Sequence, residues 1–309
     1  DVNGILLVDK PEGITSFKVI SIIRRVSGIK KIGHIGTLDP FATGLLPVCI
    51  GKATRVVPYM ENFNKTYLCT ARFGAFSDTQ DCTGRFYGGR KATQKEVELF
   101  SLNDFEKMKQ LISSLEGEHW QTPPQYSAVK INGRPAYAYA RKGVEVSIKP
   151  RKINIYSART LDVRFDGHFE ISFEITCSKG TYIRMICEQL GELTAWGAYA
   201  QNLRRTQCGL FSIENAYTVE QIQADFPDCL ADMLMPMSDG LRHIESLELT
   251  KEEADRIKLG QKLELSEFSS RINDDRIKYR AMYKDQLIAV VYPCYNSNPA
   301  VLRIERMMA

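Results

Sequence analysis

The chain has 309 residues, of which 44% are hydrophobic and 25% charged, so its composition is that of a folded globular protein and its length predicts one large domain and one small one. Its 41 Lys and Arg residues against 37 Asp and Glu residues permit a phosphate-rich partner without requiring one. The longest apolar runs are strand-sized, which excludes a membrane-spanning helix of about 20 residues, and residues 1–9 lack the pattern of a signal peptide.

The cysteines indicate a reduced protein without a structural metal. None of the eight belongs to a C-x-x-C pair, and no histidine stands at a zinc-ligand spacing from them. Scattered cysteines in apolar surroundings are typical of reduced core residues, which predicts a cytoplasmic location.

The first elements in chain order are a strand and a helix. Residues 5–8 are apolar and lead into a turn at residues 9–13, which is typical of a buried strand. A helix is predicted next, with Ser16 as its N-cap and Gly28 at its end. Its predicted inner stripe consists of Phe17, Ile20 and Ile23.

Two alternating segments predict the central sheet. Residues 67–73 and 169–177 alternate apolar with polar side chains, as strands with one wet face do. Between them, Asn103 or Asp104 is expected to cap a helix that ends at Gly117. Strands dominate without a regular βαβ rhythm, so we expect the α+β class, with a mixed or antiparallel central sheet and flanking helices.

The last quarter of the chain predicts a small β-rich domain. The stretch 235–240 is the best boundary, which divides the chain into residues 1–238 and 239–309. Thr250 and Glu253 form a capping box for a helix ending at Gly260. Strands are predicted at residues 279–283, 287–292 and 301–304.

The loop of residues 33–47 is the most unusual segment. It places three glycines and two prolines around one carboxylate, Asp39. Pro40 restricts its own φ and the residue before it, so the loop can hold Asp39 in one geometry suited to nucleophilic or acid/base work. The alternative is an ordinary Asp-Pro turn in which Asp39 only caps backbone amides.

This loop reads G-H-x-G-T-L-D-P-x-A-T-G-L-L-P, and it resembles the TruB family of tRNA pseudouridine synthases. The order and spacing of further matches extend the resemblance from residue 4 to about residue 215. They lie at residues 4–11, 65–67, 71–74, 78–81, 123–130, 139–141, 177–184 and 203–206. The resemblance implies a pseudouridine synthase fold with an RNA-binding insertion at about 76–142, and the end domain is similar to a PUA-type RNA-binding module.

The resemblance also implies three catalytic residues: Asp39 as the catalytic carboxylate, Tyr67 stacked on the target base, and Arg184 paired with the carboxylate. The reaction breaks the C1′–N1 bond, rotates the uracil and rejoins it through C5, without a metal or an organic cofactor. The carboxylate could add to C6, attack C1′ or remove the 2′ proton, and the sequence leaves these routes open. Without the resemblance, Tyr67 would be assigned to the core and Arg184 to a solvated helix face.

Four further residues are implied to bind the substrate nucleotide. A uridine in a folded RNA must leave its stack to be modified, and His34 is expected to fill the gap that it leaves. Tyr182 is expected to pack against the nucleotide, while Lys10 and Leu203 line the pocket. Without the resemblance, His34 would be an ordinary loop histidine and Leu203 a core residue.

Basic residues interleaved with aromatic ones predict an RNA face outside the pocket. A charge run more often marks a solvated surface, so this set depends on the resemblance. The expected contacts are Lys130, Arg141, Arg204 and Arg205, and further candidates are Arg24, Arg25, Lys30, Lys31 and Arg134.

The resemblance implies an enzyme that modifies the T-loop uridine at tRNA position 55 and binds the T-arm, although the sequence itself does not identify the target uridine. We expect it to act as a monomer with no obligatory protein partner and no membrane contact. One alternative is a guide-RNA-dependent relative. The extended stretch 76–142 resembles the stand-alone bacterial members of the family, which favours the form that needs no guide. Another is a non-enzymatic tRNA-binding or folding factor, which would have no chemical reason to keep Asp39, Tyr67 and Arg184 together.

Overall fold

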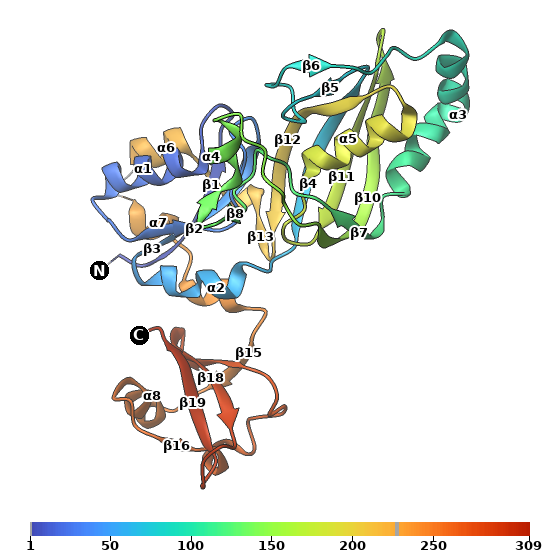
Figure 1. Cartoon of the computed structure of the whole chain (residues 1–309). Coiled ribbons are helices and arrows are strands. Elements are labelled where there is room, and N and C mark those ends of the chain that lie inside the picture. Colours follow the sequence, from blue (N-terminus) through green and yellow to red (C-terminus); the bar gives the residue numbers. More distant parts are fainter. Residues whose placement is uncertain (1, 226–228) are drawn as a thin grey trace.

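The computed structural model describes residues 2–225 and 229–309, so Asp1, the first residue of the predicted large domain, lies outside the described residues. The chain forms a ten-stranded and a five-stranded sheet, with helices around the larger one (Figure 1). The large sheet contains parallel and antiparallel pairs, which confirms the α+β class with a mixed central sheet. Within the described residues, no helix combines the length and apolar character needed to cross a membrane.

The large sheet has two halves joined by one strand. Strands run in the order β14-β1-β3-β12-β4-β11-β10-β7, with β2 on β3 and β13 on β12. Strand β12 is parallel to β3 on one side and antiparallel to β4 on the other. The strands are β1 (Gly4–Lys10), β2 (Ile32–His34), β3 (Thr43–Ile50), β4 (Lys65–Phe73), β7 (Gly117–Gln121), β10 (Arg151–Phe165), β11 (Phe169–Cys177), β12 (Ala198–Cys208), β13 (Phe211–Ser212) and β14 (Tyr217–Thr218).

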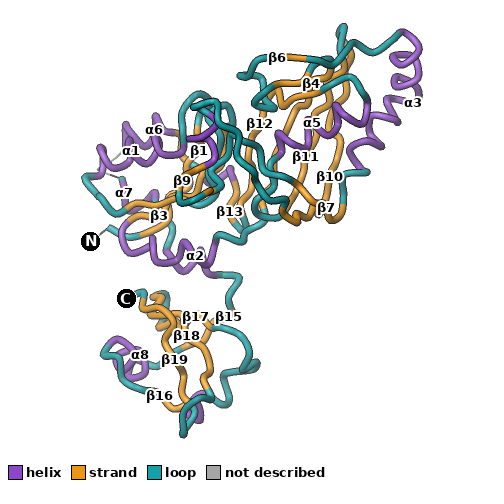
Figure 2. The backbone as a smooth tube through the Cα atoms, in the orientation of Figure 1, coloured by secondary structure: helices purple, strands orange, loops and turns teal. Residues whose placement is uncertain are grey.

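Helices surround this sheet, and short hairpins lie in the stretch 76–142 (Figure 2). The helices are α1 (Ser16–Ser27), α2 (Val57–Met60), α3 (Gln94–Ser113), α4 (Ala136–Ala140), α5 (Ile183–Thr194), α6 (Val219–Asp225) and α7 (Leu230–Met233). The 3-10 segments of the described residues are η1 (Gly51–Val56), η2 (Ile213–Asn215), η3 (Met237–Leu241) and, in the C-terminal part, η4 (Leu265–Phe268). The hairpin strands are β5 (Phe76–Ser77), β6 (Phe86–Tyr87), β8 (Lys130–Ile131) and β9 (Arg134–Pro135).

Strand β11 confirms the predicted alternation and shows where the main core lies. Its apolar side chains are at most 1% exposed, whereas the polar ones between them are half-buried. Trp196, beyond α5, stacks on Phe169 with the ring centroids 5.1 Å apart. Burial of this face between the sheet and α5 fixes the strand's register, because a one-residue slip would expose every core side chain. Six of the eight cysteines, which are all free, are also buried.

Helix α1 differs from the prediction in its N-cap and in its buried face. Its N-cap is Thr15, whose side chain accepts a hydrogen bond from the Lys18 amide, and not Ser16. Ser16 instead shares the buried face with Ile20 and Ile23, so Phe17 points outward and is 67% exposed. The prediction of Phe17 as an inner residue is therefore wrong, because one helical position rotates a side chain by about 100°.

Helix α3 also begins earlier than predicted. It starts at Gln94 with a capping box between Thr93 and Glu96. Non-helical residues 102–105 divide it into two helices, so a second helix follows Asn103 and Asp104, near the predicted start. These two residues have left-handed φ values of 50° and 55° instead of the extended backbone of an N-cap, and the second helix ends at Ser113, before Gly117.

The C-terminal sheet has the order β15-β17-β18-β19-β16 and packs with one helix, α8 (Lys251–Lys258). The capping box of Thr250 and Glu253 is confirmed. The strands are β15 (Glu245–Glu248), β16 (Leu263–Glu264), β17 (Tyr279–Tyr283), β18 (Gln286–Cys294) and β19 (Val301–Met307). The unit contacts η1 and α2, where Arg55 donates to the Met307 carbonyl at 3.1 Å and Tyr59 to Glu305 at 2.8 Å.

The alternation in β11 predicts unequal costs for neighbouring substitutions. Ile175→Ala should lower the free energy of unfolding by about 2–5 kcal/mol, because it leaves a cavity in the core. Glu174→Ala, which removes a partly exposed ion pair with Arg159, should cost less than about 1 kcal/mol. Urea unfolding followed by circular dichroism measures both, and equal losses would contradict the assigned faces.

Candidate active site

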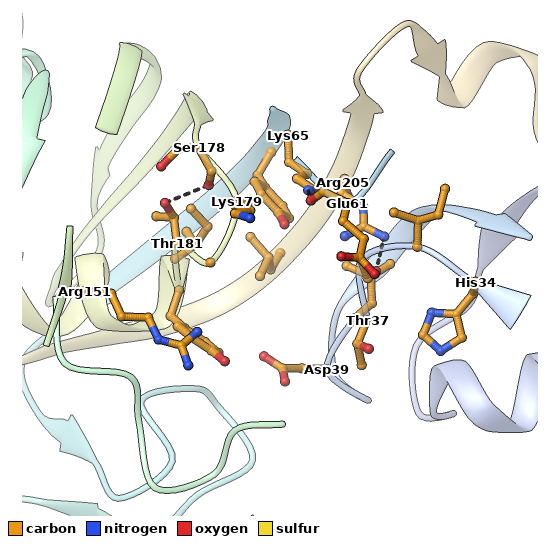
Figure 3. Close-up of a pocket in the computed structure, with 18 of the residues that line it drawn as sticks. His34, Thr37, Asp39, Glu61, Lys65, Arg151, Ser178, Lys179, Thr181 and Arg205 are labelled. Carbon is orange, nitrogen blue, oxygen red and sulfur yellow. Dashed lines mark hydrogen bonds between the residues drawn. The ribbon is translucent and has the colours of Figure 1, made fainter. Parts of the chain in front are cut away.

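A cavity of about 710 Å³ opens between the loop that carries Asp39 and the turn before α5 (Figure 3). Asp39 and Thr37 lie on one wall, and Arg151, Lys179 and Thr181 lie on the other. The lining residues are His34, Ile35, Gly36, Thr37, Leu38, Asp39, Val57, Glu61, Lys65, Tyr67, Arg151, Lys152, Ser178, Lys179, Gly180, Thr181, Tyr182, Ile183, Leu203 and Arg205.

Hydrogen bonds hold the loop on both sides of Asp39. The buried hydroxyl of Ser16 accepts from the Leu38 amide at 2.9 Å, and the Pro40 carbonyl accepts from the Gly13 amide at 2.7 Å. The Asp39 carbonyl accepts from the Ala42 amide at 3.1 Å, so an Asp-Pro turn is present in the backbone. The Asp39 side chain, however, is not its cap, because it pairs with Arg184 instead.

Arg184 is 3% exposed, so its alternative assignment to a solvated helix face is wrong. Its Nε donates to Asp39 Oδ2 at 2.7 Å. The two terminal nitrogens donate to the carbonyls of Thr79 at 2.8 Å and Tyr126 at 2.9 Å. All three nitrogens are therefore engaged, and the guanidinium cannot turn away from the carboxylate without leaving a buried donor unpaired.

Tyr67 comes from β4 and lines the same cavity as Asp39. Burial raises the pKa of its phenol to about 12, although the nearby Arg205 opposes this shift. The phenol is therefore neutral at physiological pH, and its ring can provide an aromatic face at the cavity wall. Cross-strand pairing with Arg205 on β12 sets the position of Tyr67 in the sheet.

Three of the four predicted nucleotide-binding residues line the cavity: His34, Tyr182 and Leu203. Burial, together with the positive charge of Arg205, lowers the pKa of His34, and its Nδ1 atom is buried without a hydrogen-bond partner. Tyr182 is held through its backbone, since its amide donates to Gln121 Oε1 at 2.8 Å and its carbonyl accepts from Nε2 at 3.1 Å.

Lys10 does not line the cavity, which corrects its predicted place. It lies behind the Asp39 loop, where its ammonium donates to the carbonyls of Pro11 at 2.9 Å, Ile14 at 2.8 Å and Pro40 at 3.3 Å. Burial lowers the pKa of Lys10 to about 8. The hydrogen bonds of Lys10 therefore support the backbone of the loop.

The predicted RNA contacts separate into two groups. Lys130 and Arg141 are exposed in the stretch 76–142, with the Arg141 guanidinium 5.2 Å from the Tyr137 ring centroid. Arg204 is half-buried and pairs with Asp9 at 2.8 Å. Arg205 is only 1% exposed, which corrects its prediction as a contact on an outer face, because its side chain points to the cavity side of the sheet.

Sequence reasoning missed several charged residues of the cavity wall. Arg151 and Lys152 begin β10, and Lys179 lies in the turn after β11. Glu61 and Lys65 enter from the segment after α2. Their sequence signal is weak, because charged residues at strand ends are usually solvated, and only the folded sheet brings the three segments together.

Comparison with known proteins gives matches over most of the chain. Residues 24–183 match the N-terminal domain of the TruB family pseudouridylate synthases, and residues 184–242 match the tRNA pseudouridylate synthase B C-terminal domain. Proteins named tRNA pseudouridine synthase B from Syntrophus aciditrophicus and Clostridium tetani are 38% and 37% identical over 84% and 94% of this chain, and over 80% and 95% of their own.

Two solved structures share the fold. A Cbf5-Nop10-Gar1 complex contains a chain with a TM-score of 0.69 and 23% identity, covering 99% of this chain and 85% of that one. An H/ACA RNP bound to a substrate RNA containing 2′-deoxyuridine gives a TM-score of 0.69 at 21% identity, with the same coverage of both chains. At this identity the likeness is evidence for the fold alone, and it supports the predicted architecture.

The raised pKa of Tyr67 predicts an alkaline loss of stability. Above pH 10 the unfolded chain ionises this tyrosine, whereas the folded protein keeps the proton up to about pH 12, so stability is lost as the pH rises between these values. The loss should approach about 3 kcal/mol relative to Tyr67→Phe, in which the titration is absent. Denaturant unfolding of both proteins from pH 9 to 12 measures it, and parallel pH profiles would contradict it.

Proposed function

Since the chain belongs to the TruB family of pseudouridylate synthases, we propose that it isomerises the T-loop uridine at position 55 of tRNA to pseudouridine, with Asp39 as the catalytic carboxylate. The Asp39–Arg184 pair carries this proposal. It presents one fixed carboxylate at a cavity that is large enough for a flipped nucleotide and is lined by an aromatic residue, Tyr67.

The carboxylate is the group that begins the reaction. The C1′–N1 bond breaks, the uracil turns within the cavity, and C5 bonds to C1′, so the atoms of substrate and product are the same. The three routes, through C6, C1′ or the 2′ proton, all require Asp39 in its ionised form at a fixed place. The charge-assisted bond from Arg184 serves this requirement, because it orients the carboxylate while its other donors are held by backbone carbonyls.

Binding of the nucleotide uses the residues around this pair. We assign to Tyr67 the stacking face for the base and to Tyr182 and Leu203 the surrounding walls. His34 fills the space that the flipped uridine leaves in the RNA. Its lowered pKa supports this role, because a histidine whose pKa lies below the ordinary 6.5 is neutral at pH 7 and can enter a base stack without desolvating a charge.

We further propose that the enzyme works on tRNA as a cytoplasmic monomer without a guide RNA or an obligatory protein partner. The stretch 76–142 supports this, because its Thr79 and Tyr126 carbonyls accept hydrogen bonds from Arg184 and make it part of the site. Exposed Lys130 and Arg141 in this stretch, and Arg204 outside it, are proposed phosphate contacts. Residues 239–309 are assigned to a PUA-like RNA-binding domain that follows a catalytic domain of residues 1–238.

Mapping pseudouridine on an unmodified tRNA transcript tests substrate, cofactor independence and the role of Asp39 together. Purified protein with EDTA should give one new stop in the T-loop after chemical labelling and primer extension. Asp39→Asn should remove the stop while the protein still binds tRNA, because the amide cannot act as the ionised carboxylate. Modification only with an added guide RNA would favour the guide-dependent alternative, and tRNA binding without modification would favour a folding factor.

Replacement of Arg184 tests the geometry of the pair. Arg184→Lys should lower the single-turnover rate at least about 100-fold with little change in tRNA affinity, because a single ammonium cannot reach the Asp39 carboxylate and the Thr79 and Tyr126 carbonyls as the planar guanidinium does. Rates at saturating enzyme and filter binding separate the two effects. A rate within tenfold of the wild type would contradict this role.

A further inference from the structure

Arg205 is one of the largest fully buried side chains in the described part of the protein. Its Nε donates to the Leu45 carbonyl at 2.7 Å, and one terminal nitrogen donates to the Gly36 carbonyl at 2.5 Å. Both acceptors belong to the segment that carries Asp39. The arginine therefore ties β12, at the centre of the sheet, to the catalytic loop.

The charge of Arg205 is not compensated by a carboxylate. Its neighbour Arg204 forms an ion pair with Asp9, and Arg184 forms one with Asp39. Among the ion pairs of residues 2–225 and 229–309, none includes Arg205, although Glu61 also lines the cavity. A buried guanidinium without a counter-ion is costly to desolvate, and the Leu45 and Gly36 carbonyls satisfy donors of Arg205 without neutralising its charge.

Two glycines of the loop make room for this arginine. A Cβ atom at Gly36, which has a φ of +64°, would lie 2.9 Å from the Arg205 guanidinium. At Gly44, which pairs with Arg205 across the sheet, a Cβ atom would lie 2.2 Å from the Arg205 carbonyl. These two glycines therefore leave the space that Arg205 occupies.

The guanidinium acts on the cavity side of the sheet. It lies 6.0 Å from the centre of the Tyr67 ring, the aromatic wall of the cavity. The positive charge of Arg205 also contributes to the lowered pKa of the His34 imidazole. The cavity wall therefore carries the positive charge of Arg205 near the Tyr67 ring on which the base is proposed to stack.

We propose that Arg205 is a positioning residue for the isomerisation, which holds the Asp39 loop against Tyr67 and places an uncompensated positive charge where the detached uracil is negative. The inference rests on the proposed function.

When the C1′–N1 bond breaks, its electron pair leaves with the uracil, which carries one negative charge until C5 uses an electron pair to bond to C1′. The C5 proton is then lost and N1 gains a proton, so the product is an isomer of the substrate. The positive charge of Arg205, held in place near the Tyr67 ring, stabilises the uracil while the uracil is negatively charged.

A matched pair of variants separates charge from packing. Arg205→Gln and Arg205→Lys each keep a donor for the loop carbonyls, but only the lysine keeps the charge. At saturating enzyme, the single-turnover rate of pseudouridine formation in tRNA should fall roughly 30-fold in Arg205→Gln and stay within about threefold of the wild type in Arg205→Lys, with tRNA affinity unchanged. Arg159→Met, which removes one charge from the same sheet away from the cavity, is the control for net charge.

The His34 imidazole supplies a readout that does not depend on activity. Its pKa, followed by NMR and assigned with His34→Gln, should rise in Arg205→Gln, because a nearby positive charge is lost, and should stay low in Arg205→Lys. Equal rates in the two variants, or an unchanged His34 pKa in Arg205→Gln, would overturn the proposal. A wild-type protein that leaves tRNA unmodified would instead overturn the proposed function, and the His34 titration distinguishes the two failures.

Discussion

The ion pair between Arg184 and Asp39 is the contact on which the rest of the site depends. A buried guanidinium must have all its donors satisfied, and here the three acceptors come from the Asp39 loop and from Thr79 and Tyr126 of the stretch 76–142. One side chain at the start of α5 thereby joins segments that lie far apart in the chain. Loss of any acceptor would leave a donor unpaired in a low-dielectric interior, so the arrangement holds together as a unit.

Strand β12 has the corresponding role for the backbone. It pairs with β3, at the end of the Asp39 loop, and with β4, which carries Tyr67, so one strand sets the distance between the Asp39 carboxylate and the Tyr67 ring. Two consecutive arginines on this strand have different surroundings because successive side chains of a strand point to opposite faces. Arg204 reaches Asp9 and solvent, whereas Arg205 is enclosed between the loop and Tyr67.

The C-terminal unit touches this arrangement only indirectly. It packs on η1 and α2 through Arg55, Tyr59 and a T-shaped contact of Phe63 with His243, whose ring centroids are 4.9 Å apart. The chain then continues through Glu61 and Lys65 into the cavity wall and β4. A unit proposed for RNA binding thus supports the segment that leads into the site, which gives it a structural role as well.

The sequence by itself determined the fold class and the faces of β11, because these depend on short-range periodicity. It also drew attention to the Asp39 loop, because that motif is continuous in the chain. Asp39, Tyr67 and Arg184 could be named through their resemblance to a family, but no local pattern could bring them to one cavity. Only the tertiary structure decided that Ser16 holds the loop, that Lys10 stands behind it, and that Arg205 is enclosed rather than solvated. These outcomes depend on which backbone carbonyls and glycines from distant strands surround each side chain, and burial of that kind is a property of the packed sheet, not of neighbouring residues.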